Sequence, residues 1–127
     1  MDDVKETMAM MGETPMKTRL RTYKYADVST MHVTKEDADL LAVDARIRSG
    51  KRDPRIPALI VFGYEEGFFV HVPEDEETFK DGLRMAKRHG YSKGMLKLLR
   101  LARDEGASFL RLDADGEPYG GLRTFDW

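Results

Sequence analysis

Two apolar runs separated by a short polar turn limit what this chain can fold into. Residues 58–62 read Ala-Leu-Ile-Val-Phe and residues 68–72 read Phe-Phe-Val-His-Val, with Gly-Tyr-Glu-Glu-Gly between them. Continuous apolar runs of this length, bounded by turn residues, are typical of buried strands. The sequence therefore predicts a buried β-hairpin over residues 58–72, at the centre of a sheet.

The segment before the hairpin predicts one strand and one helix. Residues 28–33, Val-Ser-Thr-Met-His-Val, are rich in β-branched residues and predict a strand. Leu40, Val43 and Ile47 then recur at helical spacing up to about residue 49. Thr34 precedes this helix, and its hydroxyl can accept one of the amide protons left free at a helix start.

Two helices and a last strand are predicted after the hairpin. The helices cover about 75–89 and 92–106, with Asp75 as the first N-cap, and the strand covers 108–113. The resulting βαββαβ order predicts an α+β fold, with an antiparallel sheet and helices packed on one face, as in ferredoxin-like domains. The extra helix, and an extended tyrosine segment that begins near Thr22, leave other α+β arrangements open.

Length and composition predict one globular domain with a densely charged surface. The chain has 127 residues, of which 41% are hydrophobic and 35% charged. We expect residues 1–17, which hold five methionines and no clean periodicity, to form a flexible N-terminal arm. Residues 18–127 should form the single α+β domain.

The absence of cysteine narrows the chemistry available to the chain. It excludes disulfides, thiolate nucleophiles and thiolate zinc sites. The acidic start Met1-Asp2-Asp3 does not resemble an export signal, and no run approaches the roughly 20 apolar residues needed to span a bilayer. We therefore expect a cytoplasmic protein that does not bind membranes.

Charge is polarised along the chain, although the net charge is only −2. Eight basic residues and one acid lie between residues 80 and 103, on the two predicted helices that we call the basic helix pair. The candidate binding residues are Lys80, Arg84, Lys87, Arg88, Lys93, Lys97 and Arg100 of this pair, and Arg52 of a second basic cluster over 46–55. Such a surface could contact phosphates or an acidic protein. It could equally be the solvated outer face of two amphipathic helices.

The sheet offers a second candidate surface, built around histidine. His32 and His71 are both predicted within strands, on the outer face of the sheet and with Phe69 nearby; Tyr23 and Tyr25 could join them. These groups could form a metal pair, an acid–base pair or a ligand site. The alternative is the half-polar face of a sheet open on one side.

Known catalytic and cofactor patterns do not occur in the sequence. Two histidines without a third nearby ligand do not make a zinc site. The acidic segment 113–117 lacks the glycine and carboxylate spacing of a calcium loop. We therefore expect a non-enzymatic protein with no metal and no cofactor.

The segment 67–72 invites comparison with the central RNA-binding strand of RRM domains. That motif needs a basic residue before the glycine and aromatic residues at alternate positions. Here Glu65 and Glu66 precede it, and Phe68 and Phe69 are adjacent, so they should point to opposite faces. RNA binding through this face is therefore disfavoured.

Four segments stand out together: residues 32–38, 67–73 and 110–116, and the terminal Phe-Asp-Trp. They resemble segments of a group of small uncharacterised bacterial proteins carried by plasmids, phages and integrative elements, and the resemblance spans about residues 28–127. The resemblance implies no activity and no site. It does imply a context, since accessory proteins of mobile elements often bind and modulate a host protein, including host defence enzymes.

Three functional hypotheses follow from these observations. The first is a small protein-binding or regulatory accessory protein, supported by the polarised charge and the lack of catalytic groups. The second is nucleic-acid binding through the basic helix pair, and the third is an enzyme or ligand binder that uses the open face of the sheet. The chain should be a monomer or, through an exposed strand edge, a homodimer.

Overall fold

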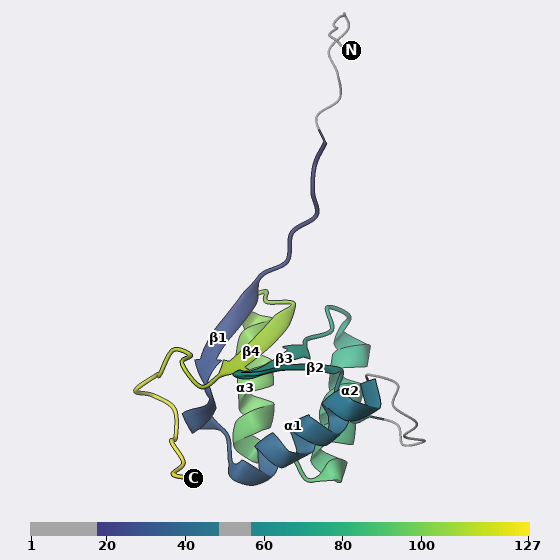
Figure 1. Ribbon diagram of the computed structural model, residues 1–127. Coiled ribbons are helices and arrows are strands. Elements are labelled where there is room, and N and C mark those ends of the chain that lie inside the picture. The colour runs from purple at the N-terminus through teal and green to yellow at the C-terminus, as the bar shows by residue number, and fades with distance from the viewer. Residues whose placement is uncertain (1–17, 49–56) are drawn as a thin grey trace, which may run out of the picture.

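The computed structural model describes residues 18–48 and 57–127, which form a four-stranded sheet and its helices (Figure 1). The elements in chain order are β1 (Tyr25–Ser29), η1 (Thr30–His32), α1 (Lys35–Arg48), β2 (Val61–Tyr64), β3 (Gly67–His71), α2 (Glu76–His89), α3 (Lys93–Asp104) and β4 (Phe109–Asp113). The predicted α+β class is confirmed. The predicted N-terminal arm lies outside the described residues.

The sheet is mixed, with strand order β1-β4-β3-β2. β2, β3 and β4 pair antiparallel, whereas β1 pairs parallel with β4 at the edge. The prediction of an antiparallel, ferredoxin-like sheet is therefore wrong for β1. The extra helix is the physical reason. If α2 alone connected β3 to β4, β4 would run in the same direction as β3, but α3 reverses the chain once more. β4 consequently runs against β3 and alongside β1.

The helix starts agree with the sequence prediction because their signals are local. Thr34 Oγ1 accepts from the Asp37 amide at 2.9 Å, and the Asp75 and Ser92 side chains accept from amides three residues on. Gly90 ends α2 with φ of 104°, a left-handed conformation that favours glycine.

The predicted strand 28–33 is displaced toward the N-terminus. β1 ends at Ser29, whose hydroxyl accepts from the Met31 amide at 3.2 Å and starts the turn η1. Short serine and threonine side chains can hydrogen-bond nearby backbone groups in this way and interrupt a strand. His32 therefore lies in a 3-10 turn and not in the sheet.

The predicted hairpin is present, but it is not at the centre of the sheet: β3 is an inner strand, whereas β2 pairs only with β3 and lies at the edge. Its turn is also shorter than expected. Gly63 and Tyr64 belong to β2, so that only Glu65 and Glu66 form the turn. Gly67 follows because β4 passes too close for a side chain: a Cβ there would lie 1.9 Å from the Leu112 carbonyl oxygen.

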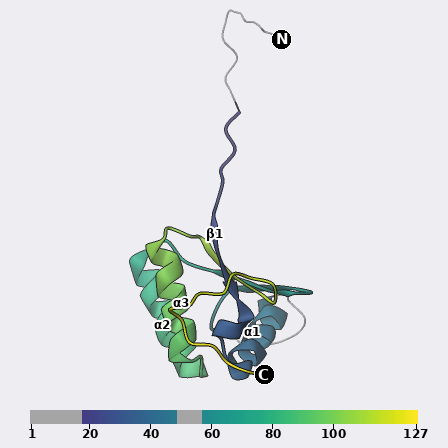
Figure 2. The ribbon, with the colours of Figure 1, turned by 90° about the vertical axis from the view of Figure 1, so that its left-hand side faces the viewer.

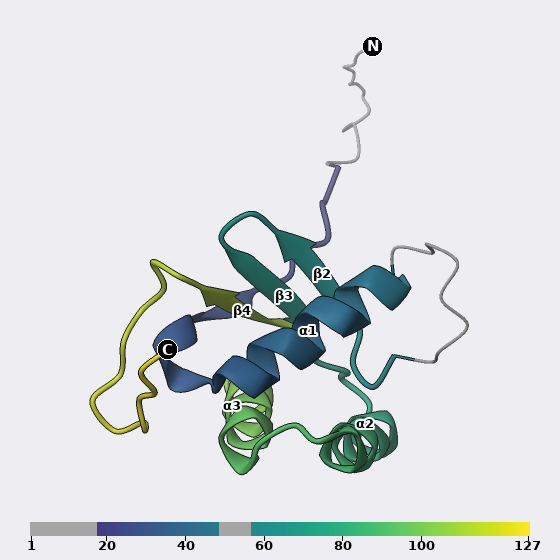
Figure 3. The same cartoon turned by 60° about the horizontal axis from the view of Figure 1, so that its bottom comes forward.

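All three helices pack on one face of the sheet, as predicted (Figures 2 and 3). Alternation along the strands turns Val61, Val70, Leu110 and Leu112 toward the helices, and all four are fully buried. α1 contacts β2, α3 contacts β4, and α2 packs against α3. Within residues 18–48 and 57–127, no helix combines the length and the apolar character that a membrane span requires.

Two buried aspartates join elements that are far apart in sequence. Asp37 of α1 accepts from the Ser92 amide at 2.8 Å and the Ser92 hydroxyl at 2.5 Å, linking the starts of α1 and α3. Asp44 accepts from the Ala58 and Leu59 amides and from the Tyr91 hydroxyl. Burial, followed by the Asp44 contact, raises the pKa of Tyr91. These carboxylates hold the fold together.

Candidate functional site

The face of the sheet opposite the helices carries polar and aromatic side chains from all four strands. We call it the open face; it consists of Tyr25, Asp27, Phe62, Tyr64, Phe69, His71, Phe109, Arg111 and Asp113. Strand register places these side chains in rows across the sheet, for example Asp27, Arg111, Phe69 and Phe62. Tyr25 is 49% exposed and Phe62 45% exposed, so the face offers large side chains to solvent.

Phe69 lies at the centre of an aromatic cluster on this face. Its ring centroid is 5.5 Å from Tyr25, 5.5 Å from Tyr64 and 6.3 Å from Phe109. The Tyr25 and Phe109 contacts are edge-to-face, the geometry that the ring quadrupole favours. His71 extends the cluster at 5.6 Å from Phe109.

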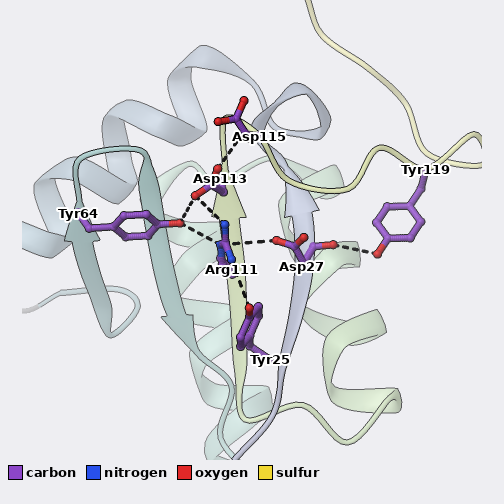
Figure 4. A network of polar contacts seen from close by, with 7 residues as sticks. All are labelled: Tyr25, Asp27, Tyr64, Arg111, Asp113, Asp115 and Tyr119. Carbon is purple, nitrogen blue, oxygen red and sulfur yellow. Dashed lines mark hydrogen bonds and ion pairs between the residues drawn. The ribbon is translucent and has the colours of Figure 1, made fainter.

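Arg111 joins the aromatic cluster to the acidic residues of the face (Figure 4). Its guanidinium contacts Asp113 at 2.9 Å, the Tyr64 hydroxyl at 3.1 Å and the Tyr25 hydroxyl at 3.2 Å. Asp27 Oδ1 lies 3.6 Å from its Nε. One cation from β4 therefore positions side chains of β1 and β2 as well as its own strand.

The Asp113 carboxylate accepts hydrogen bonds from three groups. The Tyr64 hydroxyl donates to it at 2.5 Å and the Asp115 amide at 2.7 Å, in addition to Arg111. The Tyr64 bond, with these other donors, lowers the pKa of Asp113. Burial and the Asp113 contact raise the pKa of Tyr64. The interactions of Arg111 with Asp113, Tyr25 and Tyr64 raise the pKa of its guanidinium.

This network stabilises charges rather than exposing a reactive group. Arg111 stays protonated and is balanced by Asp27 and Asp113, so the face carries no excess positive charge to bind an anion. Among the residues that the structure describes, no three His, Asp or Glu side chains come together where they could hold a metal ion.

Carboxylates collect at one end of the open face. We call this group the acidic end; it consists of Glu65, Glu66, Asp113, Asp115 and Glu117. The Ala114 amide donates to the Glu66 carbonyl at 3.0 Å, and the Ser29 amide donates to the Glu117 carbonyl at 2.9 Å. These bonds bring the β2–β3 turn and the segment after β4 to the same end of the open face.

The structure corrects the assignment of His32 to the sheet face. His32 is 3% exposed and lies under the C-terminal segment, where its Nδ1 is 2.9 Å from the Arg123 carbonyl. Its Nε2 accepts from the Tyr119 amide at 2.9 Å. A carbonyl only accepts and an amide only donates, so the ring is neutral with the proton on Nδ1. His32 therefore fastens the end of the chain and has no free nitrogen for chemistry.

The other predicted face residues divide into two groups. His71, Phe69 and Tyr25 lie on the open face as predicted. Tyr23 lies before β1 and is 62% exposed, so it is not part of the sheet. The pairing of His71 with His32 is wrong because the two residues lie in different parts of the fold.

The basic helix pair forms a surface of its own, away from the open face. Lys80 pairs with Glu76, and Arg84 pairs with Asp81. The remaining predicted residues are exposed and have no ion pair within the described part of the chain: Lys87, Arg88, Lys93, Lys97 and Arg100. Arg52 lies outside the described residues. Of the eight predicted binding residues, five are therefore exposed cations without an ion pair in the described part of the chain.

Sequence reasoning missed Arg111, Phe62, Tyr64 and Phe109 as members of the open face. The signal for two of them was available, since strict alternation in Phe109-Leu-Arg-Leu-Asp113 places every second residue on one face. Their neighbours across the sheet depended on strand order, which the sequence alone left open.

Comparison with known proteins assigns the chain to a family. No curated protein matched the chain, and no solved structure did. A match to a protein family covers residues 25–127, from the first residue of β1 to the end of the chain. The matched range includes all the segments that carry the resemblance noted in the sequence. The chain belongs to the family described as “Family of unknown function (DUF5983) C-terminal domain”.

Proposed function

We propose that this protein is a non-enzymatic protein-binding domain and that the open face is its contact surface. The observation that carries the proposal is the aromatic cluster around Phe69, half-buried except for the exposed Tyr25, on a sheet face that no described helix covers. Exposed large apolar side chains gathered in one place mark interaction sites. Tyr, Phe and Arg are enriched at protein interfaces, and Tyr and Arg are frequent hot spots.

Charge indicates what kind of partner fits this surface. The aromatic cluster is bordered at one end by the acidic end, of which four carboxylates belong to exposed residues. Phosphates would be repelled there, whereas lysine and arginine side chains would be attracted. The partner should therefore be a protein with an apolar patch and basic residues at its rim.

The size of the sheet indicates that the contact extends past the open face. Four strands about 4.8 Å apart, three of them five residues long and β2 four, present a footprint of roughly 300 Å². A stable interface buries about 800 Å² on each partner. The aromatic cluster would therefore form the centre of the contact and the acidic end part of its rim. A homodimer held by the open face alone would fall short of the area required.

A pull-down of the tagged protein from nuclease-treated lysate of the cells that encode it tests this proposal. The wild-type protein should retain a stoichiometric partner that Phe62→Ser, on the open face, fails to retain. Arg100→Glu, on α3, is the matched surface control and should retain it. A partner retained equally by Phe62→Ser would contradict the assignment of the surface.

The resemblance to proteins of plasmids, phages and integrative elements suggests the biological setting. We propose that the partner is a host protein, such as a defence enzyme, whose activity the domain modulates. Identification of the retained protein by mass spectrometry tests this; a partner encoded by the same mobile element would count against it.

Nucleic-acid binding through the basic helix pair is the second candidate. It is supported by the five exposed cations on α2 and α3 that lack ion pairs in the described structure. If they bind phosphates, the logarithm of the affinity should fall with the logarithm of salt concentration, by about 0.9 for each phosphate contacted on duplex DNA. Lys93→Glu with Lys97→Glu should then remove binding that Phe62→Ser leaves intact. No complex with labelled DNA or RNA at low salt would end this candidate.

A further inference from the structure

The outer edge of β1 is only half paired. Successive residues of a strand direct their backbone groups to opposite sides, so Tyr25, Asp27 and Ser29 face outward. At the far end, the Ser29 amide donates to Glu117 and the Asp27 carbonyl accepts from the Tyr119 hydroxyl at 2.8 Å. The Tyr25 amide and carbonyl and the Asp27 amide have no partner among the described residues.

An apolar groove lies beside this edge, on the helix side of the sheet. Its volume is about 630 Å³, and it runs between β1 and α3. Ala26, Val28 and Leu110 line it from the sheet, and Leu98 and Ala102 line it from α3. Leu101 also lines the groove, with 42% of its surface exposed. Small side chains that entered this groove would be removed from water.

The structure assigns this edge and groove to an extended segment of a partner protein. The segment would add a strand outside β1, with backbone hydrogen bonds to Tyr25 and Asp27. Every second side chain of such a strand points to the helix side of the sheet, where the groove lies. The C-terminal segment already pairs with the other half of the same edge, through Glu117.

Charge at the rim gives the occupant a further property. Asp104 and Glu105 line the groove at the end of α3, next to the start of β1, and they outnumber the one cation that lines this end, Lys24. The C-terminal end of a helix also carries partial negative charge. The peptide should therefore place a lysine or arginine at this end and small apolar residues at alternate positions beyond it.

This site is separate from the open face. The groove lies on the helix side of β1, so binding there does not depend on Phe62 or the aromatic cluster. The two surfaces meet at Tyr25 and Asp27, which contribute their side chains to the open face and their backbone groups to the edge.

Selection from a display library of random 12-residue peptides, followed by affinity measurement on the synthesised winners, tests the inference. Enriched peptides should alternate small apolar residues and carry a terminal lysine or arginine. Leu101→Glu, in the groove, should weaken their binding at least tenfold. Arg100→Glu, one residue earlier on α3, and Phe62→Ser on the open face should change it less than twofold.

Two further measurements test whether the variant folds and where the peptide binds. Leu101→Glu should keep the cooperative unfolding of the wild type because the side chain is partly exposed. In the wild type, peptide addition should shift the amide resonances of Tyr25 and Asp27. Failure to enrich peptides, or equal binding by Leu101→Glu, would overturn the inference. If Phe62→Ser lost peptide binding instead, the peptides would bind the open face and not the groove. If the protein self-associated through β1, the occupant of the edge would be a second copy of the chain.

Discussion

Removal of the Asp37 carboxylate should destabilise the fold by about 3–5 kcal/mol. Asp37 is fully buried and accepts hydrogen bonds from the Thr34 amide at 3.1 Å, the Ser92 amide at 2.8 Å and the Ser92 hydroxyl at 2.5 Å. A hydrogen bond to a charged group contributes about 1.5–3 kcal/mol. Thr34 and Ser92 are half-buried, so water would replace part of what Asp37→Ala removes, and the full sum is an upper limit.

Urea unfolding followed by circular dichroism measures this loss. Domains of this size are stable by about 5–15 kcal/mol, so Asp37→Ala should lower the midpoint strongly. Asp37→Asn keeps the shape and one acceptor, and should cost about 1–2 kcal/mol. In a double-mutant cycle, Ser92→Ala should cost less in the Asp37→Ala background than in the wild type. A loss below about 1 kcal/mol for Asp37→Ala, or full additivity with Ser92→Ala, would refute the role given to this carboxylate.

Three further changes test separate parts of the structure. Because the pKa of Asp113 is lowered in the fold, its stabilising contribution is present above about pH 4 and is lost as pH falls through the lowered value. Asp113→Asn should therefore reduce the fall in the free energy of unfolding at acid pH. An unchanged fall would contradict this. His32→Ala should cost about 2–4 kcal/mol and speed hydrogen exchange at the Tyr119 amide, whereas His71→Ala, its control on the open face, should leave that exchange unchanged. Gly67→Ala should cost more than about 3 kcal/mol in thermal unfolding, because its Cβ would overlap the neighbouring strand; a normal melting temperature would show that β4 can move away.

The helices could be predicted closely because their determinants are local. Thr34, Asp75 and Ser92 each cap a helix through an amide three residues away, a relation visible in the sequence. The α+β class followed from the same periodicities. Strand order did not, because it depends on how the α2–α3 pair turns the chain, and sequence pattern does not measure that turn.

The candidate site was predictable only in part, for a related reason. His71 and Phe69 could be placed on an outer face by alternation within one strand. His32 was misplaced because its partners, Tyr119 and Arg123, lie about ninety residues further along the chain. Arg111 became central only once β4 lay between β1 and β3.

The measurement that most directly tests the central proposal is the dissociation constant of the captured, purified partner for wild type and Phe62→Ser, by titration calorimetry. Hot-spot truncation costs about 2 kcal/mol or more, which is roughly a 30-fold change in affinity. We expect Phe62→Ser to bind at least that much more weakly, with an unchanged melting temperature. Equal affinity for both proteins, or a loss produced instead by Lys97→Glu, would show that the open face is not the contact surface.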